Sequence, residues 1–165
     1  ETVETVDMDE WDDRLSTNLK APFMFIQSCL PYLAKSKAPR VILTSCMEAQ
    51  CGSSSAGISF TVAKGGLISL TRICAKQLAP MGITVNCVAP GGMYNINQYS
   101  DDVSDGKAVA VQRDKVHWSV AENVSPLGRS CTAEDIAVVY EFLASEEAGF
   151  ITGDVINVNG GMYCC

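Results

Sequence analysis

Histidine and closely paired cysteines, the residues that most often bind zinc, are scarce in this sequence. The chain of 165 residues has one histidine, His117, and none of its eight cysteines forms a Cys-x-x-Cys pair. Structural zinc sites need four such ligands at characteristic spacings, so we expect no metal site. Several cysteines lie in apolar segments, where a free thiol packs as a small hydrophobic group. This usage favours a reducing compartment, either the cytoplasm or an organelle matrix or stroma, over a disulfide framework.

Long apolar runs and an excess of positive charge are also missing. No apolar run reaches the roughly 20 residues needed to span a bilayer, so the sequence predicts no transmembrane segment. Lys and Arg number 12 against 19 Asp and Glu, and this balance argues against nucleic acid as a partner. The acidic excess precedes Arg14, at Glu1, Glu4, Asp7, Asp9, Glu10, Asp12 and Asp13. It permits a basic partner, but we favour a solvated arm at a helix start, where acids suit the helix dipole.

Apolar periodicity predicts two long helices in the first half of the chain. Apolar residues recur at helical spacing over 9–35, where Pro22 removes one backbone donor and is expected to bend the helix. A second helix is predicted over 59–79. Its Gly65 and Gly66 are small enough for another helix to approach closely.

Three short apolar segments, 40–45, 84–89 and 155–158, are predicted to be strands. A further helix is expected to begin after Thr132, which resembles a helix cap. The polar, weakly periodic segment 92–131 is expected to be a long excursion of the kind that covers a binding site. Alternating strands and helices predict one α/β domain with a parallel sheet flanked by helices.

A series of short motifs runs in order through nearly the whole chain. The motifs are Asp9-Glu10-Trp11-Asp12 leading to Asn18-Leu19, Ala63-Lys64-Gly65-Gly66-Leu67, Gly82-Ile83-Thr84-Val85-Asn86 through Pro90-Gly91, Pro126-Leu127-Gly128-Arg129, and Ile151-Thr152-Gly153 through Gly160-Gly161. Each motif alone is weak, but the ordered series resembles the short-chain dehydrogenase/reductase family, especially its carrier-protein ketoacyl reductases. The resemblance implies the C-terminal half of a Rossmann-like fold, in a family that transfers hydride between NAD(P) and a carbonyl or alcohol carbon.

The resemblance also implies four catalytic positions, of which two are altered. Asn18 and Lys64 match the family's asparagine, which orders a water, and its lysine, which lowers the pKa of a catalytic tyrosine. The tyrosine position holds Phe60, which has no proton to give. The serine position falls at Cys46, with Ser45 one residue earlier as the competing assignment. We therefore lean towards a protein that is not an enzyme.

The cofactor positions are incomplete as well. The resemblance places Lys64, Pro90, Gly91, Met93 and Asn95 at the cofactor, with Asn95 where the family has threonine. The 165 residues contain no G-x-x-x-G-x-G turn, which would present backbone N–H groups to the pyrophosphate. We expect this chain alone to bind no cofactor, and to bind NAD(P) only if the cofactor-binding half is supplied. Three explanations remain for the missing half. This chain is part of a longer polypeptide, another subunit supplies the half, or an assembly has adopted a truncated relative as a building block.

Three functions remain open from the sequence. We favour a non-catalytic structural or assembly subunit. It would associate with other subunits, or with copies of itself, through the helices at 9–35 and 59–79. The alternatives are the C-terminal part of an NAD(P)-dependent 3-ketoacyl-type reductase and a nucleotide-sensing module. His117 and Trp118, within the polar excursion, are expected to pack rather than to catalyse.

Overall fold

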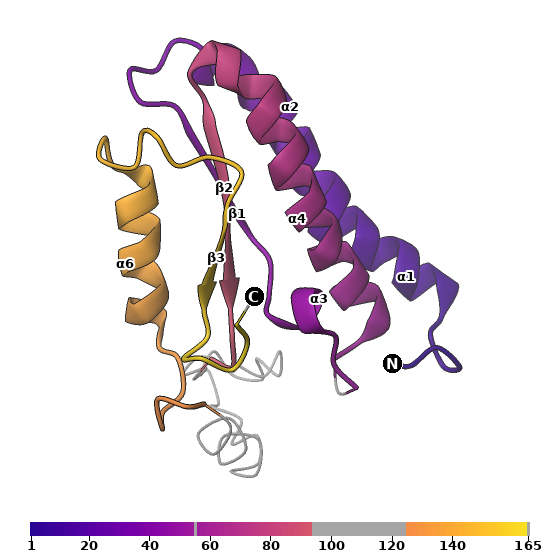
Figure 1. Ribbon diagram of the computed structural model, residues 1–165. Coiled ribbons are helices and arrows are strands. Elements are labelled where there is room, and N and C mark those ends of the chain that lie inside the picture. Colours follow the sequence, from indigo (N-terminus) through magenta and orange to yellow (C-terminus); the bar gives the residue numbers. More distant parts are fainter. Residues whose placement is uncertain (55, 94–124, 165) are drawn as a thin grey trace, which may run out of the picture.

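Three parallel strands form the centre of the fold (Figure 1). A computed structural model describes residues 1–54, 56–93 and 125–164. Within them, β1 (Arg40–Thr44), β2 (Thr84–Pro90) and β3 (Val155–Val158) lie in the order β1-β2-β3. Val41 aligns with Val85, and Cys87 aligns with Val155. The parallel α/β fold predicted from the sequence is confirmed.

The predicted helix over 9–35 is a continuous helical segment with an irregular turn. It consists of α1 (Met8–Leu15), a π-helical turn η1 (Ser16–Lys20) and α2 (Ala21–Leu33). In the π-helical turn the Ala21 N–H bonds to the Ser16 carbonyl, one residue further back than in an α-helix. Pro22 follows in the first turn of α2, where a missing N–H costs little. The irregularity expected at Pro22 therefore lies just before it.

The second long helix, α4 (Ile58–Leu78), packs along the sheet beside α2 and is followed by a 3₁₀ turn, η2 (Ala79–Met81) (Figure 1). Gly66 meets the π-helical turn so closely that a Cβ there would lie 2.6 Å from Cδ2 of Leu19. The predicted close approach at a small residue is therefore present.

By length and composition alone, Ile58–Met81 is apolar enough to cross a membrane. The sequence predicts no such segment, because polar residues interrupt the apolar runs of this helix. In the fold, Ala63, Leu67 and Cys74 of this helix are buried. The core of the protein accounts for its apolar composition.

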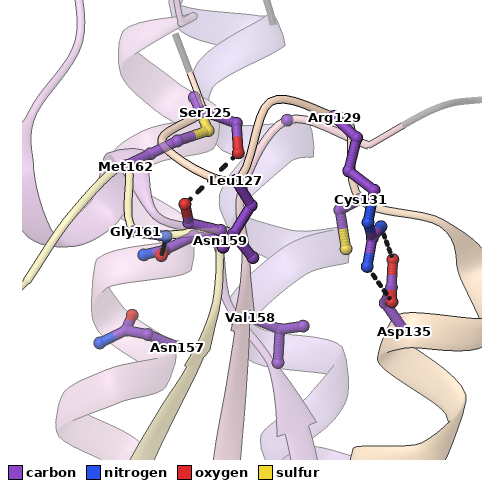
Figure 2. Close-up of a pocket in the computed structure, with 12 residues that line it drawn as sticks. Ser125, Leu127, Arg129, Cys131, Asp135, Asn157, Val158, Asn159, Gly161 and Met162 are labelled. Atoms are coloured by element: carbon purple, nitrogen blue, oxygen red, sulfur yellow. Dashed lines mark hydrogen bonds and ion pairs between the residues drawn. The ribbon is translucent and has the colours of Figure 1, made fainter. Parts of the chain in front are cut away.

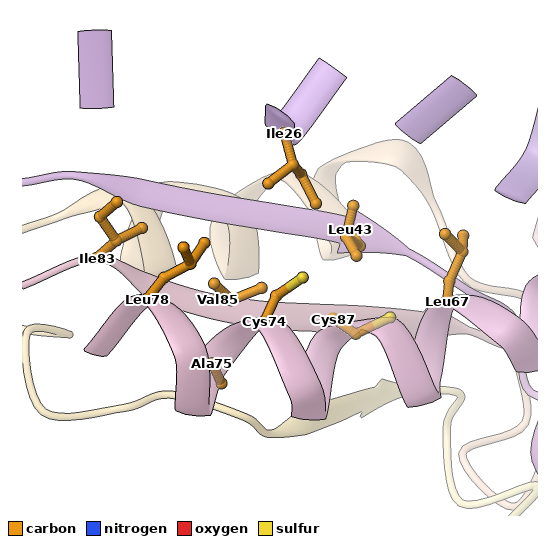
Figure 3. Close-up of a cluster of buried hydrophobic side chains, with 9 residues drawn as sticks. All are labelled: Ile26, Leu43, Leu67, Cys74, Ala75, Leu78, Ile83, Val85 and Cys87. Carbon is orange, nitrogen blue, oxygen red and sulfur yellow. The ribbon is translucent and has the colours of Figure 1, made fainter. Parts of the chain in front are cut away.

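The two faces of the sheet carry separate apolar clusters. Between the sheet and α2 and α4, one cluster gathers the side chains drawn in Figure 3: Ile26, Leu43, Leu67, Cys74, Ala75, Leu78, Ile83, Val85 and Cys87. On the opposite face, α6 (Ala133–Ala144) buries Ile136 and Leu143 against Val88. A capping box starts α6, because Thr132 and Asp135 each accept the other's backbone N–H. The predicted start after Thr132 is confirmed.

A short helix that the sequence did not predict, α3 (Glu48–Cys51), follows β1. It links β1 to the Gly/Ser-rich loop before α4. The Gln50 side chain donates a 2.6 Å hydrogen bond to Asn157 on β3. The segment after β1 is thereby fixed over the carboxyl ends of the strands, where α/β proteins place their sites.

Candidate functional site

Lys64 reaches the end of β1 from the first turns of α4. Its Nζ donates a 2.9 Å hydrogen bond to the backbone carbonyl of Thr44, the last residue of the strand. Burial lowers the pKa of Lys64, and the neighbouring Cys46 and Cys87 oppose this effect. The ammonium group therefore lies at the carboxyl edge of the sheet, where the Thr44 carbonyl accepts its hydrogen bond.

Phe60 lies one helical turn before Lys64 and presents its ring to the ammonium group. The Lys64 Nζ lies 5.5 Å from the centre of the Phe60 ring, within the range of a cation–π interaction. A tyrosine at this position would offer an acidic hydroxyl whose pKa the ammonium would lower. The ring of Phe60 can stabilise the charge of Lys64 but cannot transfer a proton.

Ser45 and Cys46, the two candidates for the serine position, have different roles. Ser45 is buried, and its hydroxyl donates a 2.8 Å hydrogen bond to the Lys64 backbone carbonyl. That bond ties the end of β1 to α4 and engages the Ser45 hydroxyl within the fold; which of the two residues holds the family's serine position stays a prediction. Burial, the largest cause, and the neighbouring Glu48 together raise the pKa of the Cys46 thiol to about 11, although a backbone hydrogen bond with Ala49 opposes them. The thiol therefore stays protonated at neutral pH, and it is a weak hydrogen-bond donor.

Asn18 sits inside the π-helical turn rather than in a regular helix. Its Nδ2 donates a 3.1 Å hydrogen bond to the Arg14 carbonyl. Among the described residues, the Asn18 side chain makes no hydrogen bond to Phe60 or Lys64. The structure thus brings Phe60, Lys64 and the end of β1 together, while the side chain of Asn18 bonds within its own helix.

Three of the positions predicted for the cofactor, Pro90, Gly91 and Met93, lie at the end of β2 or just after it. The Pro90 carbonyl accepts the Met47 N–H at 2.9 Å, and the Gly91 N–H donates to the Val158 carbonyl at 3.0 Å. A Cβ on Gly91 would lie 2.8 Å from Cβ of Asn159. Glycine is therefore required where these two segments of the backbone pass each other. Met93 forms an isolated bridge with Cys131.

Most of the predicted excursion over 92–131 lies outside the described residues, which include 92–93 and 125–131. Asn95, His117 and Trp118 lie outside the described residues. Their predicted roles stay predictions. Within the described residues, no group of three or more His, Cys, Asp or Glu is placed to hold a metal ion.

A pocket of about 330 Å³ opens between the start of α6 and the segment after β3 (Figure 2). None of the predicted catalytic residues lines it. The Arg129 guanidinium binds the Asp135 carboxylate through contacts of 2.5 and 2.8 Å. This pairing, with the bonds from Thr132, holds the pKa of Asp135 well below its usual range.

Sequence analysis missed this pocket because its lining comes from separate segments. The sequence indicates the motif that ends at Arg129 and the helix cap at Thr132, but only the fold brings these segments close to Asn159 and Gly161. Asn159 is itself satisfied, since it donates to the Tyr163 carbonyl and accepts the Gly161 N–H. The polar groups at this pocket are thus largely paired within the protein.

Comparison with known proteins agrees with the motif series and the fold. A family model described as enoyl-(acyl carrier protein) reductase matches residues 1–163. The 3-oxoacyl-(acyl-carrier-protein) reductase FabG of Staphylococcus epidermidis is 40% identical over 157 residues, covering 93% of this chain and 58% of the relative. The corresponding protein of Staphylococcus aureus is 36% identical, over 93% of this chain and 57% of the relative.

A reductase of the same name from Salmonella typhimurium is 34% identical over 157 residues, covering 94% of this chain and 58% of the relative. The chain therefore spans somewhat more than half the length of these relatives. The match covers both helical layers and all three described strands. On these grounds the chain belongs to the short-chain dehydrogenase/reductase family.

Proposed function

We propose that this chain is a non-catalytic member of its family that serves as a structural or assembly subunit. The observation that carries the proposal is the pairing of Lys64 with a ring that has no hydroxyl: Nζ stands 5.5 Å from the centre of Phe60. The reaction of the family requires an acid or base at this position. Lys64 is retained without the group whose pKa it would lower.

The serine position weakens the same step. A hydroxyl there would stabilise the substrate oxygen, whereas Cys46 offers a thiol that is a poor donor and whose pKa is raised to about 11. Loss of one general acid typically slows a reaction by ~10²–10⁴-fold. Replacing the hydroxyl that binds the substrate oxygen by a thiol weakens stabilisation of the same transition state. Both substitutions are tolerated when the protein has no need to transfer hydride.

The residues present fit only one end of a nicotinamide cofactor. In a bound cofactor, Lys64 would meet a ribose hydroxyl, as the family resemblance implies, and the cofactor itself would supply or accept the hydride. The 165 residues contain no G-x-x-x-G-x-G turn for its pyrophosphate. Gly91, expected beside the nicotinamide, is packed against Asn159. A complete cofactor site is therefore not formed by these residues alone.

An exposed apolar helix supports the assembly role. In α2 only Ile26 is buried, while Phe25 is 70% exposed and Tyr32 is 76% exposed. Phe23 and Met24 are also exposed. Large contiguous apolar patches on a protein surface mark interaction sites. We propose that α2 and the adjoining face of α4 bind another subunit or a second copy of the chain.

The enzymatic test is an assay of the native protein with NADH or NADPH and a 3-ketoacyl thioester. We expect no turnover from the natural sequence, and none from Phe60→Tyr or from Phe60→Tyr combined with Cys46→Ser. A nicotinamide-dependent rate in Phe60→Tyr would show that the missing hydroxyl was the only defect and would overturn the proposal.

The assembly test measures mass in solution, by light scattering, for the natural protein and for Phe25→Ser. We expect a complex that Phe25→Ser weakens. Val138→Ser is the matched control, because Val138 is an exposed apolar residue of α6, on the other side of the sheet. A monodisperse monomer of the natural protein would contradict the assembly role.

A reductase function remains the second candidate, since identities of 34–40% to ketoacyl reductases extend over at least 93% of the chain. A nucleotide-sensing role rests on the retained Lys64. Calorimetric titration with NADH and NADPH separates these candidates from a pure scaffold. Binding with turnover supports the reductase, binding without turnover supports the sensor, and absence of heat supports the scaffold.

A further inference from the structure

A shallow groove of about 300 Å³ lies between the C-terminal half of α4 and the loop that precedes β3. Arg72 and Lys76 line one side of it, and Thr152 and Gly153 line the other. The floor includes Ala75, which is 3% exposed. This groove shares no lining residue with the pocket beside Arg129 and contains none of the predicted catalytic or cofactor positions.

The two cations of the groove have no anionic partner in the part of the chain that the structure describes. The only ion pairs found there are Arg14 with Glu10 and Arg129 with Asp135. Arg72 and Lys76 are four residues apart on one helix, so their charges face the same side, and like charges at this spacing repel. Lys76 gains some compensation near the helix C-terminus. Arg72, one turn earlier, gains less.

The opposite wall of the groove is held rigidly by β2. Asn86 donates a 2.8 Å hydrogen bond to the Ile151 carbonyl and accepts the Asp154 N–H at 3.2 Å. The Gly153 N–H bonds to the Val85 carbonyl at 2.7 Å. The loop is therefore fixed before any ligand arrives, and a preorganised wall reduces the entropy lost on binding.

Thr152 adds a hydrogen-bond donor to the same wall. Its Oγ1 accepts the Val85 N–H at 3.0 Å. A hydroxyl that accepts one bond still has its own proton to donate. The nearest acid along the loop, Asp154, turns a carboxylate oxygen to the Val155 N–H at 2.8 Å. The groove thus combines a guanidinium, an ammonium and a hydroxyl, all of them donors.

We infer that the groove between α4 and the 151–154 loop is a binding site for a phosphate group, carried by a small phosphate ester or present as free phosphate. Arg offers a planar pair of donors that matches phosphate oxygens, and Lys adds a mobile point charge. The volume is at the lower end of the range for small-molecule sites. The site lies apart from Phe60 and Lys64, so it does not depend on whether the protein transfers hydride.

The test titrates the native protein with inorganic phosphate and with glycerol 3-phosphate, using calorimetry and the backbone amide NMR signals of Thr152 and Gly153. Glycerol is the uncharged control. We expect saturable binding that moves these amides, and a loss of affinity of about tenfold or more in Arg72→Ala/Lys76→Ala, because each cation contributes a charge-assisted bond. Tighter binding of the ester identifies an organic ligand; equal binding identifies the free ion.

The matched control is Lys35→Ala/Lys37→Ala, which removes the same two charges from exposed positions outside the groove. We expect it to keep its affinity to within about twofold, as distant exposed charges are largely screened at physiological salt. Circular dichroism verifies that both double variants are folded. The proposal is overturned if the natural protein shows no saturable binding of either probe, or if the control loses as much affinity as Arg72→Ala/Lys76→Ala.

Discussion

Each face of the sheet is covered by helices, and the α6 side, called the closed face below, differs from the α2 side, called the open face, in how firmly its helix is anchored. Leu143 of α6 is 1% exposed, and the helix is capped at its start by Thr132. Arg40 of β1 donates two hydrogen bonds to the Ser145 carbonyl, just after the end of α6. On the other side, Phe25 is 70% exposed. α6 also exposes Val138 and Phe142, so the difference lies in the anchoring of the two helices, and the α2 side is the one that we propose for a partner.

The largest expected effect is on the closed face. Leu143→Ala removes a fully buried side chain, and such truncations cost about 2–5 kcal/mol of the free energy of unfolding. Phe25→Ala, on the open face, is expected to cost less than about 0.5 kcal/mol, the usual limit for surface substitutions. Urea denaturation at a protein concentration where the chain is monomeric measures both. A large loss in Phe25→Ala would mean that α2 is already covered within one chain.

The next effect compares two glycines. Gly91→Ala introduces a Cβ 2.9 Å from the Cα of Asn159, a backbone contact that cannot yield easily. We expect a loss of about 1–3 kcal/mol, as for other overpacked sites. Gly65→Ala is the control, because its Cβ would meet only the Ala49 carbonyl at 3.8 Å, and it is expected to stabilise α4 by about 0.5–1 kcal/mol. Thermal unfolding measures both, and equal losses would refute the packing argument.

Helix caps give a smaller difference between the two sides. Thr132→Ala removes the cap of α6 and is expected to cost about 0.5–2 kcal/mol, since α6 folds as part of the closed face. Asp7→Ala removes the cap of α1, where the carboxylate accepts the N–H groups of Asp9 and Glu10. That helix buries no residue, so local fraying should absorb most of the loss. Hydrogen exchange is expected to rise throughout α6 in the first variant and only in α1 in the second.

The smallest effect is a dependence on alkaline pH. The pKa of Cys46 is raised from 9.0 to about 11, so the folded state holds this proton after the unfolded state has lost it. The stability from this proton is present below pH 9 and is lost as pH rises from about 9 to 11. Cys46→Ser is expected to reduce that loss in urea melts at pH 8 and pH 10. Cys51→Ser, at an exposed thiol, is the control and should leave it unchanged.

Periodicity predicted the strands and long helices because each depends mainly on local side-chain pattern. The start of α6 was predictable from Thr132, whose cap partner is three residues away. The π-helical turn and α3 were not, because the turn packs Leu19 against Gly66 of α4 and α3 is tied to β3 through Gln50. In the candidate site, the family resemblance assigned Phe60 and Lys64 to neighbouring catalytic positions, and the fold shows the ring near the ammonium group. The buried role of Ser45 needed the fold, since its partner is the backbone of α4.

The hydrogen bond from Lys64 to Thr44 has a consequence for the border of the sheet. Among the described residues β1 pairs only with β2, and the Ser45 N–H bonds to Val88 of β2. Neighbouring residues of a strand point their backbone groups to opposite sides. The Thr44 carbonyl therefore faces the border of β1 that no described strand covers, and Lys64 occupies its acceptor. A charged lysine at such a border hinders the unwanted strand addition that leads to aggregation, which gives Lys64 a structural role that does not depend on hydride transfer.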